Sequence, residues 1–311
     1  MVFIIASCSL CLMTMKVNFP AVTTIDDGSF FMLKLFPFHI VGAASGGRHQ
    51  ILDISLNRKV DLKTLKLKEQ RFIVYFKEKK LFILSSKGEI LESYQLVGEN
   101  RNIISSYIDD LKNDGYDNIF LVAGEKGAEF GDTLIILSFD GGTIKEVHNQ
   151  SFQVLNPWKV QTCNVDGDDE KEISLGVYKE TQLHPVMAKR PFIYEWQEGM
   201  LVPKWRGSRL SRPFTDYIFS DMDGSGSDEL IAIEILENGE KVLHAYKWKG
   251  FGFEGIGESS NYADIKEIKK SEADNNGKLY ALVKERDEEK WYSFCLKEEK
   301  IEILKENGEG K

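Results

Sequence analysis

The chain is a succession of short apolar runs, each rich in β-branched and aromatic residues and each ended by a tight polar turn. After Lys16 no stretch has the apolar spacing of a long amphipathic helix. Five pairs of runs, the first being "FIVYFKEKKLFILSSKG", resemble hairpins with a bulky residue just before the turn: Phe76, Phe139, Trp196, Trp248 and Leu296. These residues are 63, 57, 52 and 48 positions apart. The pattern predicts β-hairpin repeats of about 50 residues.

Acidic loops recur with the same period. The stretches "NVDGDDEKEI" and "DMDGSGSDEL" begin at Asn164 and Asp221, and weaker copies begin at Asp110 and Glu272. Their starts are 54, 57 and 51 positions apart, and each loop precedes its hairpin by a similar distance. Each unit therefore predicts a strand, an acidic loop, a second strand and a hairpin. Such units bury their faces only by stacking on neighbours, which indicates an all-β fold of the β-propeller class. Unrelated turns in a β-rich protein are the alternative.

The predicted propeller has about six four-stranded blades. Five are recognisable from Arg71 to Gly308, and residues 17–69 are expected to add a sixth, irregular blade or a closing strand. Residues 1–16 read as a truncated signal or lipoprotein segment, residues 17–308 as a single propeller domain, and residues 309–311 as a tail.

The two strong loops place oxygen-bearing side chains at positions 1, 3, 5 and 9. These are Asn164, Asp166, Asp168 and Glu172 in the first loop, and Asp221, Asp223, Ser225 and Glu229 in the second. Alternate oxygens on a tightly turning loop can converge on a hard cation, for which calcium is the natural choice. An EF-hand is excluded, because position 12 is Leu175 or Ala232 instead of a bidentate glutamate.

The weaker copies are less suited to a metal. Asp110 and Asp114 are candidate ligands, but Lys112 stands at position 3, where its ammonium group could replace the ion. The copy at Glu272 reads as a metal-free turn. At every loop the alternative is a turn made by Asp and Gly without an ion.

A compact loop that closes at position 9 between strands resembles the calcium loops of FG-GAP/VCBS-type repeats, which occur in integrin-α-like β-propellers and many bacterial surface proteins. The family motif is Asp-x-Asp-Gly-Asp-Gly-x-Asp-Glu-Leu. The loop "DMDGSGSDEL" departs from it at Ser225, and "NVDGDDEKEI" departs at positions 1, 6 and 8. The resemblance covers Asn102 to about Gly308. It implies calcium as the cofactor and a ligand-binding scaffold outside the cytoplasm.

The net charge of −9 at pH 7 argues against non-specific nucleic-acid binding, which needs a basic face. The four cysteines form neither a disulfide framework nor a zinc pattern. The first fifteen residues are uncharged, too few to span a bilayer comfortably. Within them "IASC" resembles a bacterial lipoprotein box, which would make Cys8 a lipid anchor, although no Lys or Arg precedes it. A buried N-terminal strand is the alternative.

Basic residues cluster near the middle of this acidic chain. The cluster predicts a ligand surface made of His184, Arg190, Arg206, Arg209 and Arg212, unless these arginines pair with the neighbouring acidic loops. No familiar nucleophile, metalloprotease or phosphate-binding motif is present. The sequence therefore favours a non-enzymatic, calcium-binding scaffold for a protein or glycan ligand at the cell surface. The alternatives are a propeller enzyme acting on a glycan or another extracellular polymer, and a structural module of an envelope complex.

Overall fold

The computed structural model describes residues 61–85, 89–168, 170–207, 209–270, 279–285 and 288–304, together with the backbone of four strands within residues 22–51. The chain divides into two compact units, 1–60 and 61–311. This division falls inside the range predicted as one domain. Among the described residues no helix is long and apolar enough to cross a membrane. Cys8 lies outside the described residues.

The N-terminal unit contains one antiparallel sheet in the order β1-β2-β3-β4. Its strands are β1 (Val22–Ile25), β2 (Phe30–Leu35), β3 (Phe38–Ser45) and β4 (Arg48–Ile51). A four-stranded sheet therefore forms within the range that was expected to hold an irregular blade.

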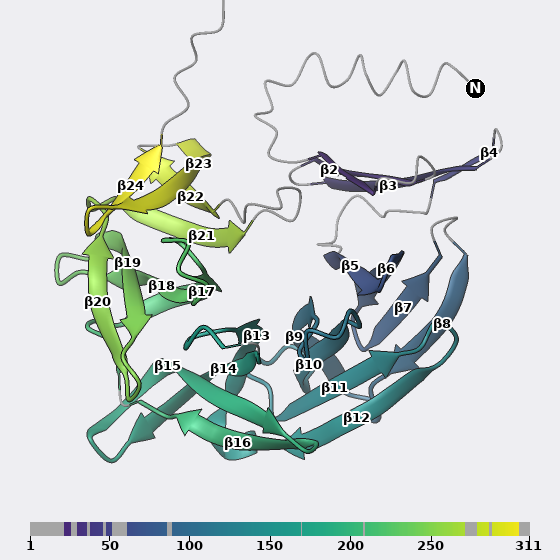
Figure 1. Cartoon of the computed structure of the whole chain (residues 1–311), viewed down its shortest axis with the longest axis horizontal. Coiled ribbons are helices and arrows are strands. Elements are labelled where there is room, and N and C mark those ends of the chain that lie inside the picture. The colour runs from purple at the N-terminus through teal and green to yellow at the C-terminus, as the bar shows by residue number, and fades with distance from the viewer. Residues whose placement is uncertain are drawn as a thin grey trace, which may run out of the picture. The chain divides into compact units, whose positions relative to one another are not determined.

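The larger unit consists of five four-stranded antiparallel meanders in chain order (Figure 1). A short parallel pairing of β20 with β24 joins the last two meanders into one eight-stranded sheet. The first two contain β5 (Asp61–Leu67), β6 (Gln70–Lys77), β7 (Lys80–Leu84) and β8 (Ile90–Gln95), then β9 (Arg101–Asp109), β10 (Asn118–Glu125), β11 (Thr133–Phe139) and β12 (Ile144–Ser151). The third contains β13 (Pro157–Cys163), β14 (Glu172–Thr181), β15 (His184–Gln197) and β16 (Met200–Trp205), and follows the 3-10 helix η1 (Gln153–Leu155). The last two contain β17 (Phe214–Ser220), β18 (Glu229–Ile235), β19 (Lys241–Trp248) and β20 (Phe253–Glu258), then β21 (Asp264–Lys270), β22 (Leu279–Glu285), β23 (Glu288–Lys297) and β24 (Lys300–Leu304).

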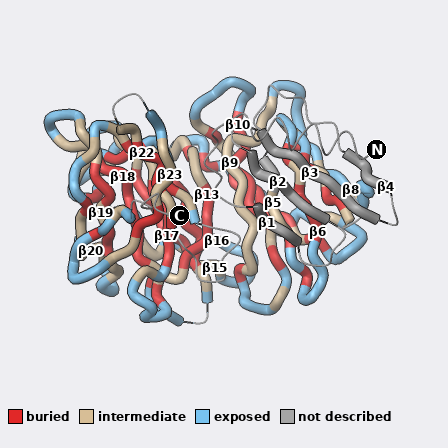
Figure 2. The backbone as a smooth tube through the Cα atoms, turned by 90° about the horizontal axis from the view of Figure 1, so that it is seen from above, coloured by how far each residue is buried: buried red, intermediate tan, exposed pale blue. Residues whose placement is uncertain are grey.

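Burial changes from strand to strand within each sheet (Figure 2). The second strands β10, β14 and β18 are buried over six consecutive residues, because both of their faces are covered. The fourth strands β8, β12 and β16 have no fully buried residue, as expected for an outer edge. The first strands lie next to one another, with β9 contacting both β5 and β13, and β17 contacting both β13 and β21. Each sheet thus runs outward from its first strand.

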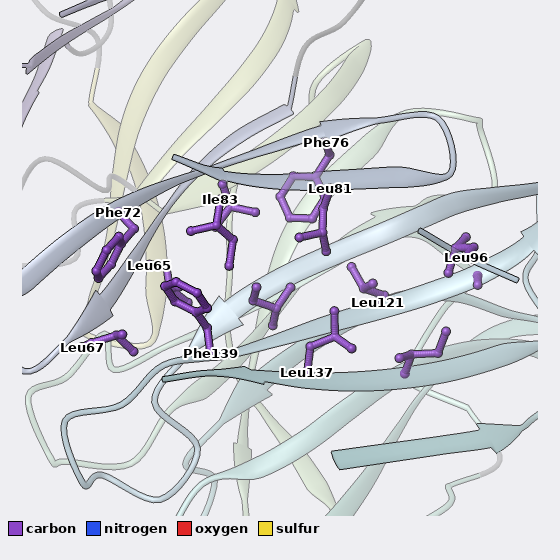
Figure 3. Packing of buried hydrophobic residues seen from close by; sticks show 14 residues of the cluster. Leu65, Leu67, Phe72, Phe76, Leu81, Ile83, Leu96, Leu121, Leu137 and Phe139 are labelled. Atoms are coloured by element: carbon purple, nitrogen blue, oxygen red, sulfur yellow. The ribbon is translucent and has the colours of Figure 1, made fainter. Parts of the chain in front are cut away.

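Neighbouring sheets are joined by hydrophobic clusters that follow the two-residue period of the strands. Ile119 and Leu121 of β10 face the first sheet, where they pack in one cluster with Leu65 and Phe76. Figure 3 labels Leu121, Leu65 and Phe76. The alternate residue Phe120 faces the third sheet and packs in a second cluster. Two further clusters join the third sheet to the fourth and the fourth to the fifth. Every described junction between successive sheets in the larger unit is therefore an apolar interface.

The structure corrects the predicted register of the first repeat. The hairpin that contains Phe76 joins β6 to β7, the second and third strands, whereas the other four hairpins join third and fourth strands. The first sheet consequently begins at Asp61 instead of Arg71. Its connection between first and second strands is the tight turn at Lys68, where the backbone is left-handed with φ 55°. This sheet lacks an acidic loop, so the sequence offered no marker to correct the register.

We expect Gly131→Ala to destabilise the protein by about 1–3 kcal/mol, because added atoms in a packed core force backbone shifts. A Cβ at residue 131 would lie 2.5 Å from Val122 Cγ1 and 2.6 Å from the carbonyl oxygen of Ala123. Gly142→Ala is the control, since its nearest neighbour atom would be 3.9 Å away. Urea unfolding of both variants measures the difference. Equal stabilities would contradict the tight approach at Gly131.

Candidate cation-binding loops

The acidic loops join the first and second strands of successive sheets. The Asp110 loop lies between β9 and β10, the Asn164 loop between β13 and β14, and the Asp221 loop between β17 and β18. The loop that contains Glu272 lies outside the described residues. The Asn164 and Asp221 loops touch directly, since the backbone N–H of Asp228 donates to the carbonyl oxygen of Asn164 at 2.6 Å. They therefore lie on the same rim of adjacent sheets.

Position 1 shapes each loop by accepting backbone hydrogen bonds. The Asp110 carboxylate accepts from the N–H groups of residues 114 and 115, at 3.1 and 2.6 Å. The Asn164 side chain accepts from residue 167 at 2.8 Å, and the Asp221 carboxylate accepts from residues 224, 225 and 226. Position 4 is left-handed in all three loops, with φ values of 54° at Asn113, 75° at Gly167 and 73° at Gly224. Glycine and asparagine suit this conformation because they tolerate a positive φ.

In the Asn164 loop, a lysine ammonium group lies between the carboxylates of positions 3 and 9. Lys204, on β16, donates hydrogen bonds from Nζ to Asp166 and Glu172 and lies 3.6 Å from Glu195 Oε1. The other oxygen of Glu172 accepts from the backbone N–H of Val165 at 3.1 Å. Burial raises the pKa of Glu172, although the Lys204 hydrogen bond opposes this. The Lys204 pKa is raised, because its hydrogen bonds to both carboxylates outweigh its burial.

The Asp221 loop has the same arrangement around a different lysine. Lys247, on β19, places Nζ 2.5 Å from Asp223 Oδ2 and 3.1 Å from Ser225 Oγ. It also lies 3.2 Å from Oε1 of the fully buried Glu229, an ion-pair distance although that oxygen accepts no hydrogen bond. The other Glu229 oxygen accepts from the N–H of Met222 at 2.8 Å. The hydrogen bond from Lys247 lowers the pKa of Asp223 to about 2, whereas burial raises the pKa of Glu229.

The predicted calcium ligands converge only in part. Carboxylate oxygens of Asp221, Asp223 and Glu229 lie within 4.8 Å of one another, but Lys247 already contacts two of these groups. In the other strong loop the carboxylate of Asp168 accepts from the N–H of Glu170 at 2.9 Å, within its own segment. An ion at either loop would have to displace an ammonium group. With these lysines in place, the described arrangement does not fit calcium. Calcium binding at these loops stays a prediction from the sequence alone.

Position 8 ties each loop to the preceding sheet. Asp117 accepts from the N–H of Lys66 at 2.6 Å and donates its own N–H to the carbonyl of Lys66 at 3.0 Å. Asp228 makes the same two-point contact with Asn164, at 2.8 and 2.6 Å. At the equivalent position Lys171 donates to both oxygens of Asp109, each at 2.8 Å. The sequence had assigned no role to position 8, which is thus an inter-sheet contact at three successive junctions.

The predicted basic surface is only partly exposed. Arg190 is fully buried and donates to the backbone carbonyls of residues 179, 184 and 186 within its hairpin, while its Nη2 lies 3.1 Å from His184 Nδ1. Because it is fully buried, Arg190 does not belong to an exposed surface, and the same burial lowers its pKa. Arg212 is half-buried between Glu234 at 3.1 Å and Glu258 at 2.6 Å. Arg206 and Arg209 are exposed.

The end of the Arg-bearing segment, at Arg212, lies away from the acidic loops. It precedes β17, and that strand runs from Phe214 to Ser220 before the Asp221 loop begins. Arg212 therefore lies at the opposite end of the sheet, where it closes a network with Glu234, His244 and Glu258. The lysines that do reach the loops follow position 9 by 32 and 18 residues, so no fixed spacing could have revealed them.

We expect Asp117→Asn to flatten the pH dependence of stability between about pH 4 and 6. Burial raises the pKa of Asp117 from 3.8 to about 6, so the folded state keeps a proton that the unfolded chain has lost. This contribution of about 1–3 kcal/mol is present at low pH and disappears as the pH rises towards 6. Asparagine can accept the same hydrogen bond without titrating. Urea unfolding at several pH values compares wild type, Asp117→Asn and the exposed control Asp114→Asn. Identical pH profiles for all three proteins would refute this assignment.

Comparison with known proteins gives the fold and no more. No family profile and no curated protein matches the sequence. The structure is similar to a crystal structure of BBS1N in complex with ARL6DN, with a TM-score of 0.55 and 11% identity over 93% of this chain and 84% of that one. It is also similar to a putative 6-phosphogluconolactonase from Bacteroides uniformis, with a TM-score of 0.53 and 11% identity over 92% and 86% of the two chains. The stacked four-stranded sheets of the chain and its likeness to these two structures support a β-propeller fold. The FG-GAP/VCBS type stays a prediction.

Proposed function

We propose that the chain is a non-enzymatic β-propeller scaffold that binds a protein partner through the rim opposite its acidic loops. The observation that carries this proposal is a group of exposed apolar side chains at that rim, contributed by the third sheet and the 3-10 helix before it. Exposed apolar side chains such as Phe251 also occur at the acidic-loop rim, but the clustered carboxylates there are neutralised by lysines of the same chain. Glycan binding is the alternative among non-enzymatic functions.

Strand direction places the exposed groups at one end of the third and fourth sheets. The Asn164 loop joins the end of β13 to the start of β14, so the start of β13 and the β14–β15 turn lie at the other end. There Val154 and Leu183 are 82% and 87% exposed, and Val186 and Met187 are also exposed. Lys189 donates to the carbonyl of Thr215 at 2.9 Å, which brings the start of β17 to the same end.

These exposed side chains are typical of a surface that binds another protein. Exposed apolar groups beside polar residues mark many protein–protein contacts, and arginine is enriched in them. Arg206 and Arg209 lie in the segment that leads to this end, and both are exposed. A partner with acidic groups around an apolar centre would match the rim. One structural neighbour, BBS1N, was crystallised in complex with another protein, ARL6DN.

A hydrolytic function is the second candidate, because one structural neighbour is a putative 6-phosphogluconolactonase. A depression of about 450 Å³ on the fourth sheet is lined by His244 and Glu258. Both residues are engaged in the Arg212 network, however, together with fully buried Glu234, which accepts a hydrogen bond from Tyr246. Acid and base groups that saturate one another are poorly placed to act on a substrate, so this network favours a structural role.

We expect the double variant Leu183→Asp/Arg209→Glu to weaken partner binding at least about tenfold, because it reverses both features of the rim. Chemical cross-linking in an envelope fraction would identify the partner, and calorimetry with the purified partner would measure affinity. Lys112→Glu, on the acidic rim, is the control and should bind as wild type does. Hydrolysis of 6-phosphogluconolactone or of a polymeric glycan by the wild-type chain would overturn the proposal in favour of an enzyme.

An extracytoplasmic location with a lipid anchor at Cys8 belongs to the same proposal. Expressed from its natural start, the protein should fractionate with membranes, because a processed Cys8 would carry acyl chains that partition into the bilayer. Cys8→Ser should release it into the soluble fraction. Cys11→Ser is the matched control, since it changes a thiol three residues away. An unchanged distribution in Cys8→Ser would exclude this anchor.

A further inference from the structure

We infer that the ammonium groups of Lys204 and Lys247 take the place of calcium in the two acidic loops, which makes this rim independent of the metal. In each loop one Nζ contacts both carboxylates, those of positions 3 and 9. These two positions were among the predicted metal ligands. The lysine therefore supplies from within the chain the positive charge that an ion would otherwise bring.

The two loops reach this arrangement from different parts of their sheets. Lys204 belongs to the fourth strand of its sheet, whereas Lys247 belongs to the third strand of the next. The acceptors are nonetheless equivalent, and in both loops the position 9 glutamate also accepts from the N–H of position 2. Both loops therefore receive one positive charge at equivalent carboxylates, although the two lysines lie on different strands of their sheets. Two separate lysines at equivalent carboxylates are difficult to attribute to a chance surface contact.

Burial makes these lysines necessary to the loops. The side chains of Glu172 and Glu229 are 4% and 0% exposed, and those of Lys204 and Lys247 are 14% and 25% exposed. An ionised carboxylate at such depth requires a compensating charge, and removing one partner of a buried pair is strongly destabilising. Once the lysine is removed, the remaining oxygens resemble a cation site that lacks its cation. Calcium should then bind where it does not bind in the wild-type protein.

The decisive variant is Lys247→Met, which keeps the aliphatic bulk of the side chain and removes its charge. After treatment with EGTA, the full-length wild type should change its melting temperature by less than about 1 °C in excess calcium, since a ligand stabilises only a state that it binds. Lys247→Met in EGTA should melt roughly 5–10 °C lower. Calcium should recover much of that loss and magnesium less, because calcium accepts the looser oxygen geometry.

Two further variants separate the charge from other effects. Lys249→Met is the matched control, because Lys249 is 47% exposed and lies 3.8 Å from an exposed partner, Glu254. It should behave as wild type. Lys247→Met/Glu229→Gln removes the buried negative charge as well, so it should regain stability in EGTA and lose the calcium response. If Lys247→Met does not fold in EGTA, its refolding yield with and without calcium replaces the melting temperature, and the double variant should still fold.

Three results would overturn the inference. One is a saturable, EGTA-reversible calcium shift in the wild type, which would restore the metal to the loops. Another is a Lys247→Met protein as stable as wild type in EGTA, which would remove the need for the ammonium group. The third is a destabilised Lys247→Met protein that calorimetry shows not to bind calcium, which would reduce Lys247 to an ordinary ion-pair partner.

Discussion

The fold of the larger unit depends on the burial of both faces of each middle sheet between its neighbours. A strand such as β10 presents Ile119 and Leu121 to one cluster and Phe120 to another, so neither set is covered unless both adjacent sheets are in place. An isolated sheet of this kind would expose a continuous apolar run to water, at a cost of about 25 cal/mol for each Å² of apolar surface. Stacking is therefore a condition of stability for each sheet, as it is in other repeat architectures.

Electrostatics on the acidic rim follow from the same stacking. The turns between first and second strands of the adjacent sheets meet there, and they bring acidic side chains together in a protein whose net charge is already −9. The chain relieves this crowding with lysines directed inward. Lys171 contacts Asp109 across a junction between sheets, whereas Lys204 and Lys247 each compensate a buried glutamate within their own sheet. Because these groups are partly screened from solvent, salt should weaken them less than it weakens exposed pairs.

The sequence predicts local features well and long-range partners poorly. The strand, acidic loop, strand and hairpin order was readable for the second, third and fourth sheets because the loop and the hairpin each carry a signature. In the first sheet the sequence showed a hairpin pattern but no acidic loop. That hairpin, around Phe76, joins the second and third strands instead of the third and fourth. The loop carboxylates were also readable from their spacing. Lys204 and Lys247 were not, since a lysine on a strand has no local mark that tells which loop its side chain will reach.

The contacts of position 8 have a direction along the chain. Asp117 contacts Lys66, Lys171 contacts Asp109, and Asp228 contacts Asn164, so in each case the later residue contacts the earlier sheet. A chain that leaves the ribosome from its N-terminus presents the receiving groups first. Each new sheet would then meet receiving groups that the chain has already produced, and no described contact of this series has to wait for a sheet not yet made. Vectorial synthesis and the order of assembly would coincide at this rim.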